Sequence, residues 1–83
     1  MISPSQVEAM IQAALPDAQV NVQSQDGEHF DVTVVSSQFA NKGLVQQHQL
    51  VYRAVQQAMS SEAIHALALK TYTPESWQTT SQS

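Results

Sequence analysis

The chain has 83 residues and a formal net charge of −4, which together with its composition excludes several classes of protein. A chain this short buries only about 60% of the surface that its unfolded form exposes, so we expect one small domain without a deep active site. The absence of cysteine excludes disulfides, Cys-based zinc sites and an all-Cys iron–sulfur site within this chain. The only basic residues are Lys42, Arg53 and Lys70, too few for a basic patch that binds nucleic-acid phosphates.

The sequence predicts a folded domain that does not enter a membrane. No apolar stretch approaches membrane-spanning length, and the first residues lack the basic and apolar regions of a signal peptide. We therefore expect a soluble, cytoplasmic protein. Hydrophobic residues make up 42% of the chain, with two glycines and three prolines, which favours a folded domain over a disordered one.

The first predicted element is a helix that begins after Ser3. Pro4 occupies the first helical position and Gln6 the third, which is the pattern of a capping box. Apolar residues then recur at helical spacing, namely Val7, Met10, Ile11, Ala14 and Leu15. Pro16 ends the helix, because the residue before a proline disfavours the helical backbone.

Two strands joined by a hairpin come next. Residues 19–23 and 29–35 alternate between apolar and polar side chains, as half-buried strands do. Asp26-Gly27 lies between them, and Asp-Gly between alternating runs is a hairpin signal. The short spacing predicts that the two strands are antiparallel neighbours.

A connection over residues 36–43 leads into a second helix, predicted from about Leu44 to Met59. Phe39 is the one large apolar residue of the connection and is expected to fill the core. Asn41 and Gly43 are the residues that best tolerate a left-handed backbone. The predicted apolar stripe of the helix consists of Leu44, Val45, His48, Val51, Tyr52, Val55, Ala58 and Met59.

A third strand is predicted from Ile64 to Tyr72. Apolar residues stand on both of its alternating sets, which indicates a central strand or one that is covered on both faces. Thr73 is expected to cap a last short helix that starts with Pro74. Trp77 in this helix is expected to fold back on the core.

The predicted element order is therefore α-β-β-α-β-α. The step from the second strand through a helix to the third is a βαβ unit, so the third strand is expected to be parallel to a neighbour. We expect an α+β fold in which a three-stranded mixed sheet carries the two long helices on one face. A single domain covers residues 1–78, and residues 79–83 form a polar, flexible tail.

The three histidines are the candidates for chemistry, and each also has an ordinary structural explanation. His48 lies in the apolar stripe of the second helix, as a packed histidine bonded to a carbonyl or as a switch or contact residue. His65 is either a strand-edge residue or a metal ligand, because neutral imidazole suits Fe, Zn and Cu. His29 is either a solvated turn residue or one that reaches a metal or partner. Two histidines are too few for a closed zinc site, so further ligands would come from water, a small thiol or another protein.

Two blocks of the sequence resemble the BolA-like family. The first block consists of His29-Phe30, Val32–Val35 with Ser36-Ser37, then Phe39, His48 and Leu50-Val51-Tyr52. The second consists of Ile64-His65-Ala66-Leu67, Lys70-Thr71 and Thr73-Pro74-Glu75-Ser76-Trp77. The resemblance covers residues 5–78, and it implies an α-β-β-α-β fold with a short C-terminal helix, similar to the class II KH arrangement.

The resemblance also implies a function. BolA-like proteins pair with monothiol glutaredoxins of the Cys-Gly-Phe-Ser type and with glutathione, and the heterodimer bridges a [2Fe–2S] cluster in iron–sulfur trafficking or iron regulation. The histidine of the Ile-His-Ala-Leu motif, here His65, is the family's cluster ligand. A second ligand, His or Cys, comes from the loop between the first two strands, where His29 is the candidate in this chain. In several members that ligand lies earlier in a longer loop.

The resemblance thus implies no cofactor in the isolated chain, because the cluster is shared. A glutaredoxin cysteine and the glutathione thiolate would hold one iron, and imidazole from this chain would hold the other. A protein that borrows its thiolates needs no cysteine of its own. The sequence leaves open whether the free chain is a monomer or a homodimer.

The alternative function is a DNA-binding transcriptional regulator, which is also a known role of BolA-type proteins. Asn41 stands where the family usually has glycine, and Gln47-His48-Gln49 replaces the usual Arg-His-Arg, which removes two positive charges from the surface proposed to bind DNA in some relatives. The Gly-x-x-Gly clamp of KH domains is also absent. These departures favour a protein partner over DNA, and no nucleophile–base pair indicates an enzyme.

Overall fold

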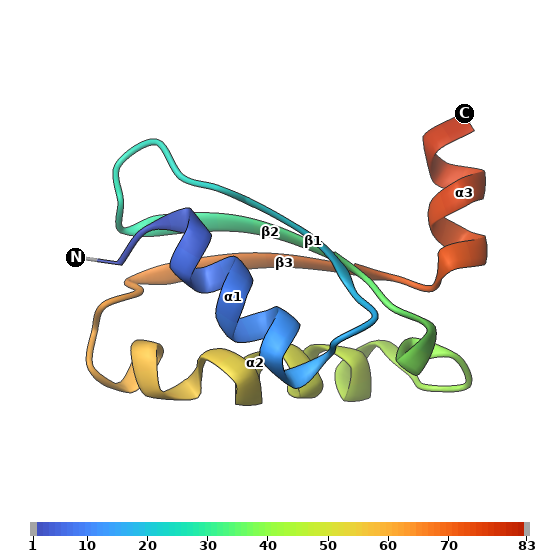
Figure 1. The fold of residues 1–83 in the computed structure, drawn as a ribbon, viewed down its shortest axis with the longest axis horizontal. Coiled ribbons are helices and arrows are strands. Elements are labelled where there is room, and N and C mark those ends of the chain that lie inside the picture. The colour runs from blue at the N-terminus through green and yellow to red at the C-terminus, as the bar shows by residue number, and fades with distance from the viewer. Residues whose placement is uncertain (1, 83) are drawn as a thin grey trace.

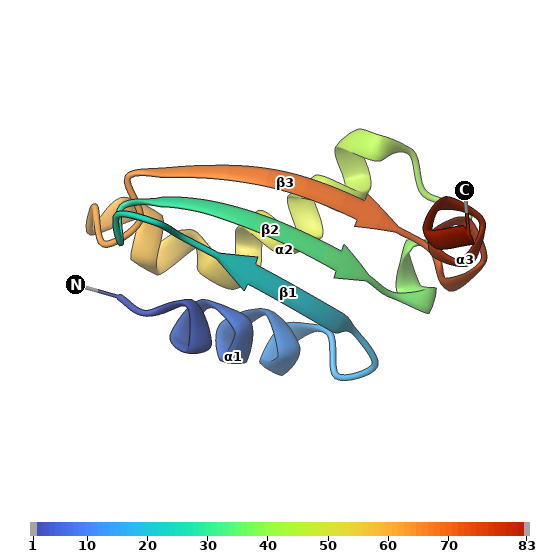
Figure 2. The same ribbon diagram turned by 90° about the horizontal axis from the view of Figure 1, so that it is seen from above.

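The computed structural model describes residues 2–82 and confirms the α+β class and the predicted element order (Figure 1). The three strands form one mixed sheet in the order β1-β2-β3. Helices α1 and α2 cover one face of it, while α3 stands at one end of the sheet and on the other side (Figures 1 and 2). The elements are α1 (Pro4–Ala14), β1 (Gln19–Gln23), β2 (His29–Val35), a 3-10 turn (Ser37–Phe39), α2 (Leu44–Ser60), β3 (Ala66–Tyr72) and α3 (Pro74–Gln82).

Local chemistry sets the limits of α1 as predicted. The hydroxyl of Ser3 accepts the backbone N–H of Gln6 at 3.2 Å, and the Gln6 side-chain oxygen accepts the N–H of Ser3 at 2.8 Å. This reciprocal pair is the predicted capping box. The helix ends at Ala14, and Leu15 donates its N–H back to Ile11 at 2.8 Å before Pro16 turns the chain away.

The pairing of the strands decides which loops meet. β1 is antiparallel to β2, and β2 is parallel to β3, as predicted, with His29 in register with Ala66. Parallel strands begin at the same end of a sheet, so the starts of β2 and β3 lie together. The hairpin between β1 and β2 lies at that end as well, and α3 lies at the opposite end (Figure 2).

The core lies between the sheet and the two long helices. Phe39 is fully buried in it, as predicted from the connection before α2. Burying a side chain of this size is worth about 1.5–3 kcal/mol. The other fully buried core residues are Val7 and Ile11 of α1, Leu15, Phe30, Val32 and Val34 of β2, Val51 and Val55 of α2, and Ile64.

The start of α2 is more exposed than the predicted stripe. Leu44 and Val45 at the start are 63% and 71% exposed, and Tyr52 in the middle of the helix is 37% exposed. The first turns of α2 pass outside the edge strand β3 in Figure 2, so they have no sheet beneath them. Only the middle and end of the helix contribute buried side chains, Val51, Val55 and Ala58.

The position of β3 also differs from the prediction. It begins at Ala66, because the N–H of Ile64 bonds to Ala58 at the end of α2 and Ile64 is used to close that helix. β3 is an edge strand, not a central one. Its alternate apolar residues, Ala66 and Ala68, are exposed on the face of the sheet opposite to α1 and α2. Because these exposed residues are alanines, the strand has apolar residues on both faces although only one face is covered.

The last helix is longer than predicted. α3 runs to Gln82 and includes residues 79–82, which the sequence assigned to a polar tail, while residue 83 lies outside the described residues. Thr79 and Thr80 donate hydroxyl hydrogen bonds to the carbonyls of Glu75 and Ser76. No glycine or proline follows Pro74 to stop the helix.

The side chain of Trp77 does not enter the core between the sheet and the long helices. Its ring packs on Tyr72 with centroids 5.2 Å apart. With Gln19, Asn21 and Thr33 it lines a shallow hollow on the open face of the sheet. None of the helices within residues 2–82 is long and apolar enough to cross a bilayer.

Candidate functional site

His29 and His65 lie side by side at the end of the sheet that is remote from α3. His29 is the first residue of β2, and His65 directly precedes β3. Their rings meet edge to face with centroids 5.5 Å apart, and both side chains are exposed. The fold thus brings together the two residues that the sequence put forward as ligands.

The backbone explains why these two residues meet. The carbonyl oxygen of Glu28 accepts the N–H of His65 at 2.9 Å and that of Ala66 at 3.2 Å. This is the first contact between the hairpin and the segment that becomes β3. It sets His65 beside the start of β2, so the ring pair follows from the parallel pairing and not from the loop sequences alone.

Asp26, predicted from the sequence only as a turn residue, is a third member of the site. One carboxylate oxygen, Oδ2, lies at hydrogen-bond distance from Nδ1 of His29, 2.6 Å away. The other, Oδ1, accepts the backbone N–H groups of Glu28 at 2.9 Å and of His29 at 2.8 Å. An acid three residues before a histidine, across a tight turn, is the sequence signal that would have revealed it.

These hydrogen bonds stabilise the charged form of the carboxylate. The backbone N–H of His29, then that of Glu28, and then the His29 ring hold the pKa of Asp26 well below its usual range. The turn beneath them is itself anchored, because Gly27 donates its N–H to the hydroxyl of Ser24 at 2.9 Å. Gly27 has a φ of 75°, which glycine adopts without the steric penalty of a Cβ.

The site offers nitrogen and oxygen donors but no thiolate. Ligand atoms of Asp26, Glu28 and His29 lie within 4.8 Å of one another, and all three residues are exposed. The ring of His65 adds a second imidazole. Such a set does not make a closed metal site, but two imidazoles can complete the coordination of an iron whose cluster is held elsewhere by thiolates.

The third histidine, His48, takes no part in this site. It is half-buried on α2, and its ring lies against Tyr52 with centroids 6.3 Å apart. Its Nε2 is buried without a hydrogen-bond partner, the one such side-chain atom among the described residues. His48 is therefore half-buried and packs on Tyr52, and the hydrogen bond to a carbonyl that is expected for a packed histidine is not made by Nε2.

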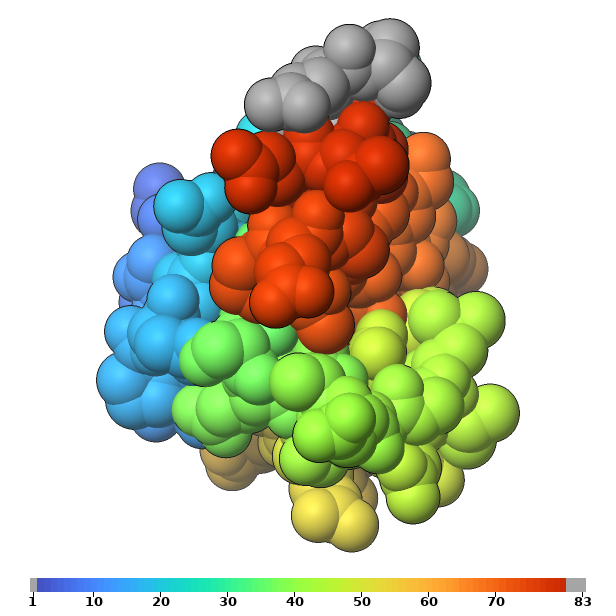
Figure 3. Space-filling model, turned by 90° about the vertical axis from the view of Figure 1, so that its right-hand side faces the viewer, coloured from blue at the N-terminus to red at the C-terminus, as the bar shows by residue number. Residues whose placement is uncertain are grey.

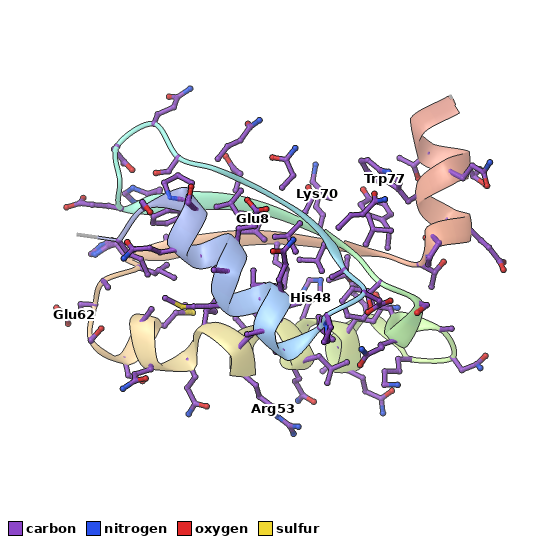
Figure 4. The ribbon with its side chains drawn as sticks, in the orientation of Figure 1. Glu8, His48, Arg53, Glu62, Lys70 and Trp77 are labelled. Atoms are coloured by element: carbon purple, nitrogen blue, oxygen red, sulfur yellow. The ribbon has the colours of Figure 1, made fainter. Side chains whose placement is uncertain are left out.

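The positive charges do not gather on one surface. Arg53 projects from the outer side of α2, whereas Lys70 lies on the opposite side of the sheet near Trp77 (Figure 4). Lys42 lies in the connection before α2. At the end of the molecule away from His29 and His65, α3 rises above the 3-10 turn and the start of α2 (Figure 3).

Comparison with known proteins identifies the family. The family described as BolA-like protein matches residues 2–76. Protein BOLA2 of Arabidopsis thaliana is 35% identical, covering 99% of this chain and 90% of that protein. The DNA-binding transcriptional regulator BolA of Vibrio cholerae is 42% identical, covering 75% of this chain and 58% of that protein. The structure of a BolA homologue from Coxiella burnetii matches with a TM-score of 0.82 and 34% identity, covering 94% of this chain and 99% of that one. The chain belongs to the BolA-like family.

Proposed function

We propose that this protein binds a monothiol glutaredoxin and, with His65 and His29, supplies imidazole ligands to a [2Fe–2S] cluster that the two proteins share. The observation that carries the proposal is the exposed pair of rings, 5.5 Å apart between centroids, at one end of the sheet. Membership of the BolA-like family supports it, because His65 stands in the Ile-His-Ala-Leu motif of that family. The role would lie in iron–sulfur trafficking or iron regulation.

The donor set fits one half of such a cluster. Histidine ligands on one iron give a [2Fe–2S] centre a higher reduction potential than an all-Cys set does. The chain has no cysteine, so the thiolates of the other iron come from the glutaredoxin and from glutathione. Both histidines are exposed at the surface, where the partner can approach them without a rearrangement of the core.

A transcriptional regulator is the second candidate, supported by the name of the Vibrio cholerae relative. Binding to DNA depends on several Lys or Arg contacts to phosphates. The three cations of this chain lie in the connection before α2, on the outer side of α2 and on the open face of the sheet. With a net charge of −4, this arrangement disfavours DNA relative to a protein partner.

The proposal is tested by mixing the purified protein with a monothiol glutaredoxin, glutathione, ferric iron and sulfide without oxygen. We expect a heterodimer on gel filtration and a change in the visible spectrum relative to glutaredoxin alone. His65→Ala should abolish the spectral change and His29→Ala should weaken it, because each removes an imidazole from the cluster.

His48→Gln is the matched control, since it removes a histidine that lies outside the site. Circular dichroism in the far ultraviolet establishes that each variant is folded. The absence of a heterodimer with the wild-type chain contradicts the proposal. A spectrum that responds equally to His65→Ala and His48→Gln also contradicts it.

A further inference from the structure

We propose that Asp26 is a positioning residue for His29: its carboxylate keeps the proton on Nδ1 and thereby leaves Nε2 as the ligand atom. The inference rests on the proposed function for the ligand role of His29. The tautomer that Asp26 imposes, in contrast, is a property of the isolated chain and can be measured there.

The two oxygens of Asp26 have separate tasks in the structure. Oδ1 accepts the backbone N–H groups of Glu28 and His29 at 2.9 Å and 2.8 Å, which closes the hairpin turn. Oδ2 accepts only the ring, at 2.6 Å from Nδ1 of His29. The backbone hydrogen bonds of the turn run to Oδ1 and the ring contact runs to Oδ2, so the two contacts can be changed separately.

The direction of that contact follows from elementary hydrogen-bond chemistry. An ionised carboxylate accepts hydrogen bonds and cannot donate one, so Nδ1 of His29 carries a proton and donates it. In the neutral ring, the lone pair then lies on Nε2. The backbone N–H groups of Glu28 and His29, which bond to Oδ1, hold the carboxylate in the position in which Oδ2 faces Nδ1 of His29.

Ligand histidines in metalloproteins commonly donate their other N–H to a carboxylate, which fixes the tautomer and the ring orientation. In this chain the same turn also sets the distance to the second ring. Asp26 bonds to the N–H of Glu28, and the carbonyl of Glu28 accepts the N–H of His65. Asp26 therefore orients one imidazole within a loop that also anchors the other.

The substitution Asp26→Asn is expected to keep the hydrogen bonds of the turn and to change only the group that faces the ring of His29. The amide retains an oxygen for the two backbone N–H groups, but it places an NH₂ group opposite Nδ1. Since an amide NH₂ only donates, Nδ1 becomes the acceptor and the proton moves to Nε2. Asp31→Asn is the matched control, because it removes the same charge from an exposed position of β2.

The first measurement is the ¹⁵N spectrum of the imidazole rings in the isolated chain, at a pH at which the rings are neutral. We expect the Nδ1–H tautomer of His29 in the wild type and in Asp31→Asn, and the Nε2–H tautomer in Asp26→Asn. The backbone amide signals of Glu28 and His29 should stay near their wild-type positions in Asp26→Asn, which shows that the turn persists. An Nε2–H tautomer in the wild type, or no change in Asp26→Asn, overturns the inference.

The second measurement is the affinity of the cluster-bridged complex. Loss of a carboxylate behind a ligand histidine typically weakens metal binding about 10–100-fold, and we expect Asp26→Asn to weaken the complex within that range. Added to His29→Ala, the same substitution should have no further effect, because the ring that it positions is gone. An equal loss in both backgrounds overturns the inference, since Asp26 would then act through the turn alone.

Two outcomes distinguish this inference from the proposed function. If His65→Ala destroys the complex but His29→Ala and Asp26→Asn leave it unchanged, cluster sharing stands and the positioning role of Asp26 is overturned. If the wild-type chain forms no complex, the proposed function fails and Asp26 positions no ligand. The ¹⁵N spectra then still decide whether Asp26 sets the tautomer.

Discussion

At the residue scale, Asp17 shows how one exposed acid can join two parts of the fold. Its carboxylate accepts hydrogen bonds from the hydroxyls of Ser36 and Ser37 at 2.9 Å and 2.6 Å, and from the N–H of Ser37 at 2.9 Å. These bonds tie the loop after α1 to the end of β2. Led by the Ser37 hydroxyl, they lower the pKa of Asp17 to about 2 from 3.8, against a smaller effect of burial.

We predict that Asp17→Asn lowers the free energy of unfolding by about 1–2 kcal/mol at neutral pH. Hydrogen bonds to charged groups contribute about 1.5–3 kcal/mol, and the value is reduced here because Asp17 is exposed and solvent screens it. Urea unfolding followed by circular dichroism measures the change. Asp31→Asn serves as control and should stay within about 0.5 kcal/mol of the wild type, as surface substitutions usually do.

The contribution of Asp17 to the free energy of unfolding depends on pH. The pKa of Asp17 is lower in the folded chain than its ordinary value of 3.8, so its stabilisation is fully present above that value. It is lost as the pH falls towards about 2, where the folded form also takes up the proton. The difference in stability between wild type and Asp17→Asn should shrink over this window. A difference that stays constant down to about pH 2 contradicts the assignment.

The backbone conformation of single residues followed only in part from their residue types. Asn41 has a φ of 64°, as its tolerance of left-handed backbone predicts, but Gly43 has an ordinary φ of −69°. Glu62 has a φ of 63°, which no residue type in its segment indicates. It follows α2 where the chain must turn so that Ile64 can bond back to Ala58. The positive φ of Glu62 is therefore imposed by the contact between Ile64 and the end of α2, and not by the conformational preference of glutamate.

At the element scale, the elements with strong end signals were predicted to within a residue or two. The capping box starts α1, Pro16 stops it, and Asp26-Gly27 makes the hairpin. The errors concern which faces are covered, as for β3 at the edge and for the exposed first turn of α2. Coverage depends on neighbouring elements, and an amphipathic pattern in one segment does not contain that information.

The packing of α3 against the end of β3 predicts the effect of removing the Trp77 ring. Trp77 packs on Tyr72 at 5.2 Å between ring centroids, and aromatic pairs contribute about 0.5–1.5 kcal/mol beyond the area they bury. We expect Trp77→Ala to lower the free energy of unfolding by at least that amount. The ¹⁵N signals of the His29 and His65 rings should not move, because the histidine pair lies at the opposite end of the sheet (Figure 1). Shifts in those ring signals would contradict the separation of the two ends.

At the scale of the whole molecule, the fold places the His29–His65 pair at one end of the sheet and α3 at the other (Figure 2). The two histidines come from segments that are 36 residues apart (65 − 29) and meet only through parallel pairing of β2 with β3. The family motif pointed to His65, and the hairpin to His29, but their contact and the role of Asp26 required the structure. Hydrogen bonds across the turn are set by backbone geometry, which residue types alone do not specify.

The charge distribution predicts that the chain does not bind DNA detectably. With three scattered cations and a net charge of −4, we expect no change in the fluorescence anisotropy of a labelled promoter duplex at about 50 mM salt, where phosphate contacts are strongest. A relative with Arg-His-Arg in α2 provides the comparison. Binding by this chain that weakens steeply as salt is raised would instead support a role on DNA.

Detecting a histidine nitrogen of this chain on the iron tests most directly whether the two proteins share the cluster. The protein is labelled with ¹⁵N-histidine, assembled with unlabelled glutaredoxin, glutathione and the cluster, and reduced for electron–nuclear double resonance. We expect strongly coupled ¹⁵N from this chain, lost in His65→Ala, reduced in His29→Ala and retained in His48→Gln. A reduced cluster in the heterodimer that shows no strongly coupled ¹⁵N would contradict this expectation.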